Sequence, residues 1–244
     1  MTFNLTRIKN FIMKITGYYI MRNNYVPVGV EAITDLKHKI KLPIGVIFDV
    51  GANIGQTSLK YSKHFPSAKI FAFEPIQSTF DQLNINTKGI KNITLIKSAL
   101  GPKSGKVKIS LFDDTLSVLN SLNQLAMNSA THSKKEMIEV MTGDEFCQLN
   151  HISKIDLLKI DTEGYELSVL EGFKQMLTQN KIKALYCEVG FSKQNKRNTL
   201  INEIIDFANQ NNFVFCGLYE IQDYAITLDN NFGNVLLLNK SYKN

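Results

Sequence analysis

The fold of this chain is decided by residues 46–57, Val46-Ile47-Phe48-Asp49-Val50-Gly51-Ala52-Asn53-Ile54-Gly55-Gln56-Thr57. An apolar, β-branched run ends in an acid, two glycines then frame a tight turn, and a helix-like segment follows. A second apolar run, Phe71-Ala72-Phe73, ends in Glu74 and Pro75. This order predicts the front half of a nucleotide-binding α/β domain, in which glycines let the backbone approach a ligand and the second acid holds a ribose diol.

The spacing of the glycines indicates which nucleotide fits. A dinucleotide-binding loop reads G-x-G-x-x-G and presents a helix N-terminus to a pyrophosphate. Here Gly51 and Gly55 stand alone, with Asn53 between them. A close turn without the phosphate pattern suits an adenosyl ligand without phosphate, S-adenosylmethionine (SAM). Two glycines are equally consistent with a turn that binds nothing, and Glu74 at the second strand end favours the cofactor.

Strands and helices alternate along the chain after this point. Alternation with short connections predicts a parallel sheet with helices on both faces. The predicted strands are 46–50, 69–73, 93–97, 155–160, 183–189, 214–218 and 234–238, with an additional edge strand at 106–111. The predicted helices are 56–64, 76–87, 165–178 and 199–211. Residues 112–136 break the rhythm, and so long a connection is often a lid or a binding loop.

The N-terminal part of the chain reads differently. Residues 5–21 repeat apolar side chains at spacings of three and four with basic residues among them, which predicts a basic amphipathic helix. Such a helix could lie on a membrane, but packing on the catalytic domain, as a lid or an interface, is the favoured interpretation. A short helix at 31–39 follows. We therefore expect a helical extension (1–40) before the main domain (41–244).

Composition limits the partners and the compartment. The net charge of +6 and the pI near 9.0 allow an anionic partner, but the charge is dispersed and no basic run is interleaved with aromatics, so we expect no nucleic-acid partner. Cys147, Cys187 and Cys216 lack C-x-x-C spacing and predict neither a zinc site nor a disulfide framework. Without an uninterrupted signal-peptide core or a stretch of about 20 apolar residues, the predicted location is cytoplasmic.

Two further motifs make the assignment specific. Ser98-Ala99-Leu100-Gly101 follows the third strand, and Leu158-Lys159-Ile160-Asp161-Thr162-Glu163-Gly164-Tyr165-Glu166 follows later. Together with D-V-G-A-N-I-G and F-E-P, in this order, they resemble the FkbM family of SAM-dependent methyltransferases from about position 45 to about position 190. The resemblance implies a Rossmann-like class I SAM methyltransferase fold, which is α/β with a doubly wound, mostly parallel sheet. It also implies O-methylation of a hydroxyl group on a sugar, a glycan or a natural product.

The same resemblance assigns cofactor contacts. The loop after the first strand would surround the methionine part of SAM, Glu74 would bind the ribose hydroxyls, and Ser98 and Ala99 would lie beside the adenine. The complete predicted cofactor-binding set is Asp49, Gly51, Ala52, Asn53, Gly55, Thr57, Glu74, Pro75, Ser98, Ala99 and Asp161.

Catalysis is expected at the D-x-E pair, Asp161 and Glu163. A sugar hydroxyl is a poor nucleophile near neutral pH and needs a base or a metal. Asp161 or Glu163 could be that base, oriented by Lys159 or Asn53. Glu163 is equally suited to capping the following helix. Two acids could also hold magnesium, but the sequence identifies no further ligand, and we predict no metal.

Other residues and other functions are weaker alternatives. Glu188, at a strand end, and His132, in the irregular segment, are further candidate bases; a lone loop histidine is more often solvated. A SAM-binding module without turnover is the main rival function. An NAD-linked oxidoreductase is disfavoured by the missing third glycine. A nucleic-acid amino-methyltransferase is disfavoured because the chain lacks a D/N-P-P-Y/F element.

Overall fold

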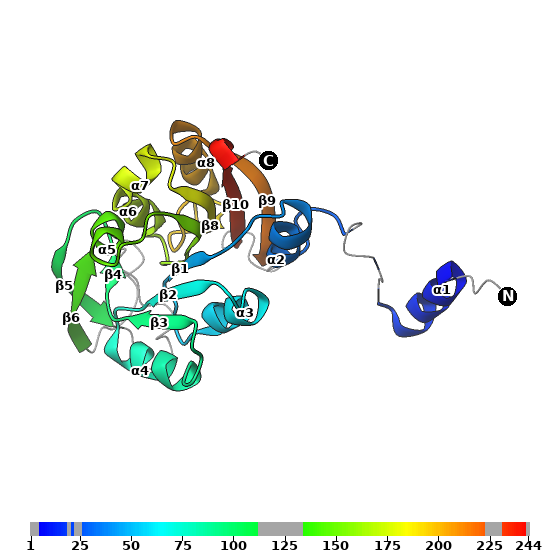
Figure 1. Ribbon diagram of the computed structural model, residues 1–244, viewed down its shortest axis with the longest axis horizontal. Coiled ribbons are helices and arrows are strands. Elements are labelled where there is room, and N and C mark those ends of the chain that lie inside the picture. The colour runs from blue at the N-terminus through cyan, green and yellow to red at the C-terminus, as the bar shows by residue number, and fades with distance from the viewer. Residues whose placement is uncertain (1–4, 19–20, 22–25, 112–133, 223–230, 243–244) are drawn as a thin grey trace.

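The computed structural model describes residues 5–18, 21, 26–111, 134–222 and 231–242. Its centre is a seven-stranded sheet, whose arrangement Figure 1 shows. The strand order is β3-β2-β1-β7-β8-β10-β9. The strands are β1 (Val46–Val50), β2 (Lys69–Phe73), β3 (Ile93–Ile96), β7 (Ile155–Ile160), β8 (Ile182–Gly190), β9 (Phe213–Gln222) and β10 (Phe232–Asn239). Neighbours are parallel from β3 to β8, and β10 runs antiparallel to both β8 and β9. The predicted mostly parallel sheet is confirmed.

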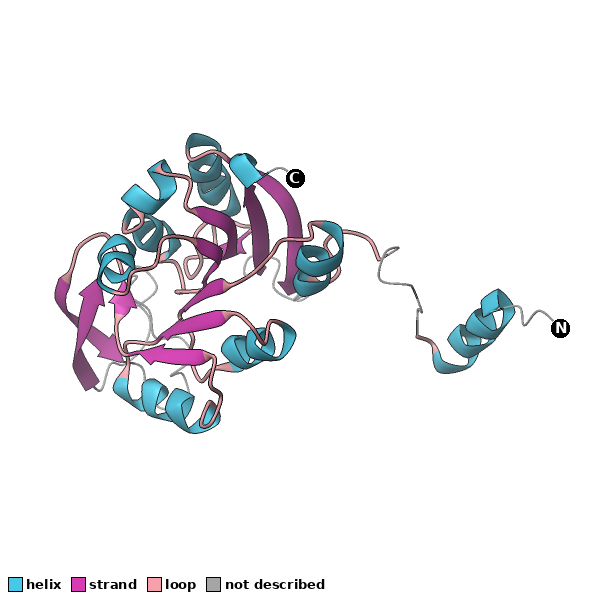
Figure 2. Cartoon of the chain, viewed as in Figure 1, coloured by secondary structure: helices cyan, strands magenta, loops and turns pink. Residues whose placement is uncertain are grey.

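Helices cover both faces of this sheet (Figure 2). The helices are α3 (Gln56–His64), α4 (Gln77–Asn86), α5 (Gly143–Leu149), α6 (Glu166–Glu171), α7 (Lys174–Thr178) and α8 (Ile201–Gln210). Along β1, Ile47 points into the core beneath α3, and Phe48 points into the core beneath α5 to α8. This alternation is the period-two pattern of a strand buried on both faces, and the sheet is doubly wound as predicted.

A second, three-stranded sheet was only partly predicted. It has the order β4-β6-β5 and consists of β4 (Ala99–Leu100), β5 (Gly105–Leu111) and β6 (Lys134–Met141). The predicted strand at 106–111 exists, but it pairs antiparallel with β6 and not with the main sheet. β6 was not predicted, and its first residues fall in the segment read as irregular. His132 and the rest of that segment, 112–133, lie outside the described residues.

The predicted helix at 165–178 is interrupted at Gly172 and Phe173. A Cβ atom at Gly172 would lie 2.3 Å from the carbonyl oxygen of Gly101, so only glycine allows this close approach. Asp144 of α5 then accepts hydrogen bonds from the backbone N–H groups of Gln175 (2.7 Å) and Met176 (3.0 Å). The Asp144 side chain of a neighbouring helix thus caps the N-terminus of α7, where the helix begins again after the break.

The N-terminal segment contains two helical pieces of different character. α1 (Leu5–Thr16) ends earlier than predicted, because Gly17 adopts the left-handed conformation (φ +71°) typical of a helix end. α2 (Ala32–Thr34) continues into a π-helical turn (Asp35–Lys39), as the predicted helix at 31–39 required. Ile33 and Leu36 of this piece are buried in the core on the α3 side of the sheet.

No helix among the described residues has both the length and the apolar character needed to span a bilayer.

Candidate functional site

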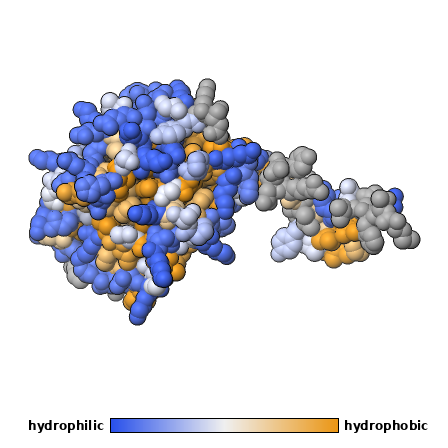
Figure 3. All heavy atoms as spheres, in the orientation of Figure 1, coloured by the Kyte–Doolittle hydropathy of each residue, from blue (hydrophilic) through white to orange (hydrophobic). Residues whose placement is uncertain are grey.

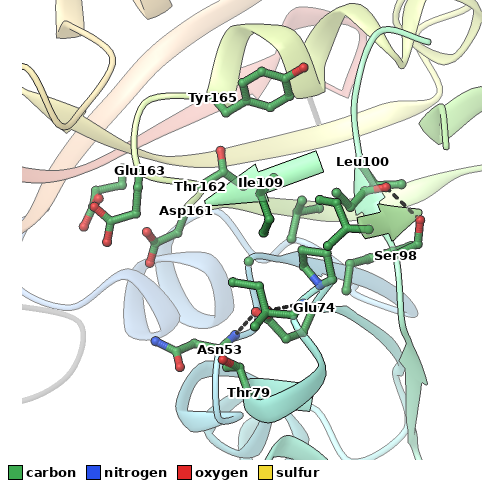
Figure 4. A pocket seen from close by; sticks show the side chains of 18 of the residues that line it. Asn53, Glu74, Thr79, Ser98, Leu100, Ile109, Asp161, Thr162, Glu163 and Tyr165 are labelled. Atoms are coloured by element: carbon green, nitrogen blue, oxygen red, sulfur yellow. Dashed lines mark hydrogen bonds between the residues drawn. The ribbon is translucent and has the colours of Figure 1, made fainter. Parts of the chain in front are cut away.

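A cavity of about 270 Å³ opens where the carboxyl ends of the central strands meet (Figure 4). The strand order reverses between β1 and β7, and doubly wound sheets bind ligands at this switch point. The lining residues are Val50, Gly51, Asn53, Phe73, Glu74, Pro75, Ile76, Thr79, Ser98, Ala99, Leu100, Ile109, Ile138, Asp161, Thr162, Glu163, Tyr165, Glu188 and Arg197.

The turn after β1 is tightly built. Gly51 has φ +75°, and a Cβ atom there would lie 1.8 Å from the carbonyl oxygen of Asp161, so the crossing of the two chains requires glycine. The N–H groups of Gly51 and Ala52 donate to the Phe73 carbonyl at 3.2 and 3.0 Å. The N–H of Asn53 donates to Glu74 at 3.2 Å. These three amides therefore already have partners within the protein and are not open to a pyrophosphate.

Glu74 is a buried carboxylate at the end of β2 that faces the cavity. Its oxygens accept hydrogen bonds from the backbone N–H groups of Asn53 and of Ile76, the latter at 3.0 Å. Burial raises the pKa of Glu74 to about 7, although these hydrogen bonds act in the opposite direction. A carboxylate held by backbone amides and aimed into a cavity is suited to accept hydrogen bonds from a diol.

One side of the cavity is apolar, and part of its wall comes from the second sheet. Ile109 of β5 and Ile138 of β6 line it together with Ala99 and Leu100. Ser98, directly before β4, ties this strand to β6, because its hydroxyl donates to the carbonyl oxygens of Ala99 (2.9 Å) and of Glu139 (3.2 Å). Ile109 and Ile138 were not predicted as site residues. The alternation of buried Ile138 and Val140 with exposed residues is the signal that could have identified their strand.

A buried lysine connects the two central strands beneath the cavity. The Lys159 amino group lies 3.0 Å from Asp49, 3.5 Å from Asp161 and 3.2 Å from the carbonyl oxygen of Gly51. Burial alone would lower the pKa of Lys159, but the charges of Asp49 and Asp161 raise it above its ordinary value. Asp49 also accepts a hydrogen bond from the Ser58 hydroxyl at 2.6 Å. Lys159 therefore holds Asp161 by an ion pair, and a role of Lys159 or Asn53 in orienting a catalytic base stays a prediction.

Several residues of the predicted cofactor set line the cavity, and several do not. Gly51, Asn53, Glu74, Pro75, Ser98, Ala99 and Asp161 line it. Asp49, Ala52, Gly55 and Thr57 are not among the lining residues. Asp49 is fully buried behind Lys159, and Gly55, with φ +98°, forms the N-terminal cap of α3. These residues shape the turn, and their direct contact with a cofactor stays a prediction.

Three carboxylates gather on the side of the cavity opposite Ser98 and Leu100, where Figure 4 shows two of them, Asp161 and Glu163. Oxygens of Asp161, Glu163 and Glu188 lie within 4.8 Å of one another. Glu163 forms an ion pair with Arg197, and Glu188 accepts a hydrogen bond from the Asn198 side chain.

Burial raises the pKa of Glu188 to about 9, and the nearby charge of Asp161 adds to the effect. The three oxygens are close enough for a divalent cation to bind among them. However, Arg197 already pairs with Glu163, and Asn198 already donates a hydrogen bond to Glu188. The absence of a metal stays a prediction.

The turn that presents Asp161 and Glu163 is held by Glu166, a residue that was not predicted to have a role. Its buried carboxylate accepts hydrogen bonds from the N–H groups of Thr162 (2.9 Å) and Gly164 (3.1 Å), and from the hydroxyl of Thr199. Burial raises the pKa of Glu166. Glu166 thus satisfies the amides of this turn, while Glu163 (φ +56°) turns its side chain to Arg197. Arg197 was not predicted either, because it lies far along the chain.

Comparison with known proteins agrees with this geometry. "Hexuronic acid methyltransferase AglP" of Haloferax volcanii is 32% identical over 132 residues, which cover 54% of this chain and 51% of that protein. "2-O-methyltransferase NoeI" of Sinorhizobium fredii is 24% identical over 159 residues, which cover 61% of this chain and 65% of that protein. The chain thus spans about half to two thirds of the length of these curated relatives.

A solved structure supports the fold. The crystal structure of methyltransferase FkbM from Methylobacillus flagellatus superposes with a TM-score of 0.51 at 15% identity, over 86% of this chain and 48% of that one. At the level of sequence, the family model described as the methyltransferase FkbM domain matches residues 49–215. Since this match covers more than half of the sequence, the chain belongs to the FkbM methyltransferase family.

Proposed function

We propose that this protein is a SAM-dependent methyltransferase that methylates a hydroxyl group of a sugar, a glycan or a natural product. The observation that carries the proposal is the buried Glu74 carboxylate, which faces a cavity at the switch point of the sheet beside a glycine turn. Family membership and the order of the motifs support the same activity.

We propose the following contacts for the parts of SAM. Glu74 would accept the ribose hydroxyls, and the apolar wall at Ala99, Ile109 and Ile138 would take the adenine. The methionine part would lie toward Gly51 and Asp161. SAM carries a sulfonium and an ammonium group, and the Asp161 carboxylate, which lines the cavity together with Gly51, is the acid that would face them.

The chain's own contribution to transfer is positioning and proton removal. When bound, SAM supplies the methyl group as an electrophile. Bound SAM would give up its methyl group and remain as the demethylated product, and a carboxylate of the protein would take the proton that the acceptor hydroxyl loses. Of the predicted pair, Asp161 is the base that we propose, because Arg197 occupies both oxygens of Glu163, whereas the Lys159 ammonium lies 3.5 Å from one oxygen of Asp161. Lys159 holds Asp161 in place.

Sugars are the acceptor class that the relatives favour. One is named for hexuronic acid and one for 2-O-methylation, and they are similar to this chain over 132 and 159 residues, respectively. The end of the cavity beside Glu163, Glu188 and Arg197 carries hydrogen-bonding groups of both signs, which suits a molecule rich in hydroxyls.

The location that fits this proposal is cytoplasmic, with peripheral contact at the inner membrane face through residues 5–21. The three cysteines, Cys147, Cys187 and Cys216, are all free, as in a reducing compartment. We propose no nucleic-acid partner.

Two experiments test the proposal. Titration calorimetry should detect SAM and its demethylated product with affinities in the low-micromolar range, about −8 kcal/mol, and no heat with NAD; binding of NAD alone would overturn it. Mass spectrometry of glycans and metabolites from cells with and without the gene should then reveal the loss of a methyl increment. SAM binding with no such loss, and no turnover on candidate glycans, would favour the non-catalytic SAM-binding module.

A further inference from the structure

We infer that α1 binds the surface of an anionic lipid bilayer through one apolar face, defined by Ile8, Phe11, Ile12 and Ile15. The inference rests on the membrane contact proposed above for residues 5–21 and specifies the contacting face and the lipid charge. It does not depend on methyl transfer being the reaction, because the face lies outside the cavity.

The four residues form one continuous stripe. Their spacing of three and four residues places them on a single side of a helix with 3.6 residues per turn. Ile8 and Ile12 are each 40% exposed, Phe11 is 65% exposed and Ile15 is 67% exposed. The four hydrophobic clusters built from the described residues contain no member of α1. Figure 3 shows apolar side chains at the surface of this helix.

Charge decides which partner suits the stripe. Residues 5–16 contain Arg7, Lys9 and Lys14 and no acid. On a helical wheel Arg7 and Lys14 flank the stripe on one side and Lys9 flanks it on the other. All three are exposed. Long basic side chains at the edges of an apolar face can extend to lipid headgroups while their stems stay in contact with the acyl region.

The other occupants of such a face fit less well. In a pair of these helices, basic residues would flank the seam on both partners with no acid to meet them, and like charges would repel. The helix has 12 residues, about 18 Å of length by the standard helical rise. It is therefore too short to span a bilayer but long enough to lie in its interface. Tyr18, 76% exposed just beyond the helix, is of a residue type enriched at membrane interfaces.

The test is co-sedimentation of the full-length protein with vesicles of pure phosphatidylcholine and with vesicles of equal parts phosphatidylcholine and phosphatidylglycerol. We expect binding to the anionic vesicles only, weakened by added salt. Phe11→Glu should reduce this binding on the order of tenfold or more, because a charge replaces the most exposed aromatic of the stripe. Asn10→Glu is the matched control. It makes the same charge change at the preceding residue, which lies on the opposite side of the helix, and it should reduce vesicle binding far less.

Further measurements make each outcome decisive. Circular dichroism and SAM titration of each variant confirm that the domain is intact and keep the result separate from the proposed function. Equal vesicle binding by the two variants, or no vesicle binding by the unaltered protein, would overturn the inference. A Phe11-dependent dimer in light scattering without lipid would assign the stripe to a second copy instead, and protection of the stripe in the lipid-free monomer would assign it to the protein's own domain.

Discussion

Glu74 is a carboxyl group whose burial has a measurable consequence for stability. Burial raises its pKa from 4.5 to about 7, so between these pH values the folded state holds a proton that the unfolded chain has released. The free energy of unfolding should therefore fall as the pH rises through this interval. Glu74→Gln has no proton to lose, so its free energy of unfolding should lack this fall, which amounts to roughly 1–3 kcal/mol. Its amide nitrogen leaves one of the two backbone N–H groups without an acceptor and lowers the stability equally at every pH. Urea unfolding across this pH range measures the difference.

The same substitution, Glu74→Gln, should weaken the binding of SAM. Removing a charged acceptor from the ribose hydroxyls should cost roughly 2–4 kcal/mol of SAM binding energy. Glu139→Gln, an identical change on the exposed side of β6, serves as the control. A Glu74→Gln protein that binds SAM like the unaltered one would show that the ribose lies elsewhere.

Asp161 distinguishes proton transfer from cofactor binding. Asp161→Asn keeps the size of the side chain and removes its charge and its basicity. If Asp161 is the base, turnover should fall by about 10²–10⁴-fold while SAM affinity changes little. Glu163→Gln, next but one in the same turn, should have a smaller effect on turnover, because that carboxylate is paired with Arg197. A parallel fall of SAM affinity and turnover in Asp161→Asn would instead assign Asp161 to the ammonium group of SAM.

Asp49 is expected to act on the fold through Lys159. Asp49→Asn would remove the closer of two carboxylates from a buried lysine and should destabilise the protein by roughly 3 kcal/mol, measured by urea unfolding. Ser58→Ala removes one hydrogen bond from the same carboxylate and should cost only about 1 kcal/mol. If Asp49→Asn lost SAM binding at unchanged stability, Asp49 would belong to the cofactor site itself.

Whether the sequence identified a site residue depended on how far that residue lies, along the chain, from the residues that it contacts. Gly51, Glu74 and Asp161 were recognised because each lies in a contiguous motif that ends a strand. Glu188 was named only as a weaker candidate base at a strand end, and Arg197 was not named. Their roles come from proximity to Glu163 and Asp161 in the folded chain, which no local pattern encodes.

At the scale of elements, the strands of the main sheet were predicted well because a strand buried on both faces is a dense apolar run. β6 and α5 were missed, although each carries a signal. Thr142 accepts a hydrogen bond from the N–H of Glu145 at 3.1 Å, so T-x-x-E marks the start of α5 as a capping motif would. The break between α6 and α7 has no such signal, because the side chain that caps α7 belongs to α5.

That break gives a prediction of its own. Asp144→Ala would leave the N–H groups of Gln175 and Met176 without their acceptor and should destabilise the protein by about 0.5–2 kcal/mol in urea unfolding. Glu171→Ala, an exposed acid near the end of α6, is the control and should change stability by less. Equal effects of the two substitutions would show that Asp144 contributes only its charge.

At the scale of the whole molecule, the sequence placed a boundary between an extension (1–40) and the main domain (41–244). The packing suggests an earlier boundary. Ile33 and Leu36 are buried in the core beneath α3, and Asp35 accepts hydrogen bonds from the Tyr219 hydroxyl (2.9 Å) and from the N–H of Gly29 (3.0 Å). Sequence alone does not predict this packing, because a short amphipathic helix has the same pattern of apolar residues whether it packs against a sheet or a membrane.

Two truncations separate these possibilities. Removing residues 1–21 takes away α1 and should leave the thermal midpoint and SAM affinity close to those of the full chain. Removing residues 1–40 also takes away Ile33 and Leu36, each a buried aliphatic side chain with a typical truncation cost of about 2–5 kcal/mol. Their combined loss is comparable to the whole stability of a domain, about 5–15 kcal/mol, and we expect this shorter protein to be largely unfolded. Thermal unfolding followed by circular dichroism measures both. If the two truncated proteins were equally stable, the boundary would lie near residue 40 after all; if the loss of residues 1–21 alone caused unfolding, the apolar stripe of α1 would be part of the core.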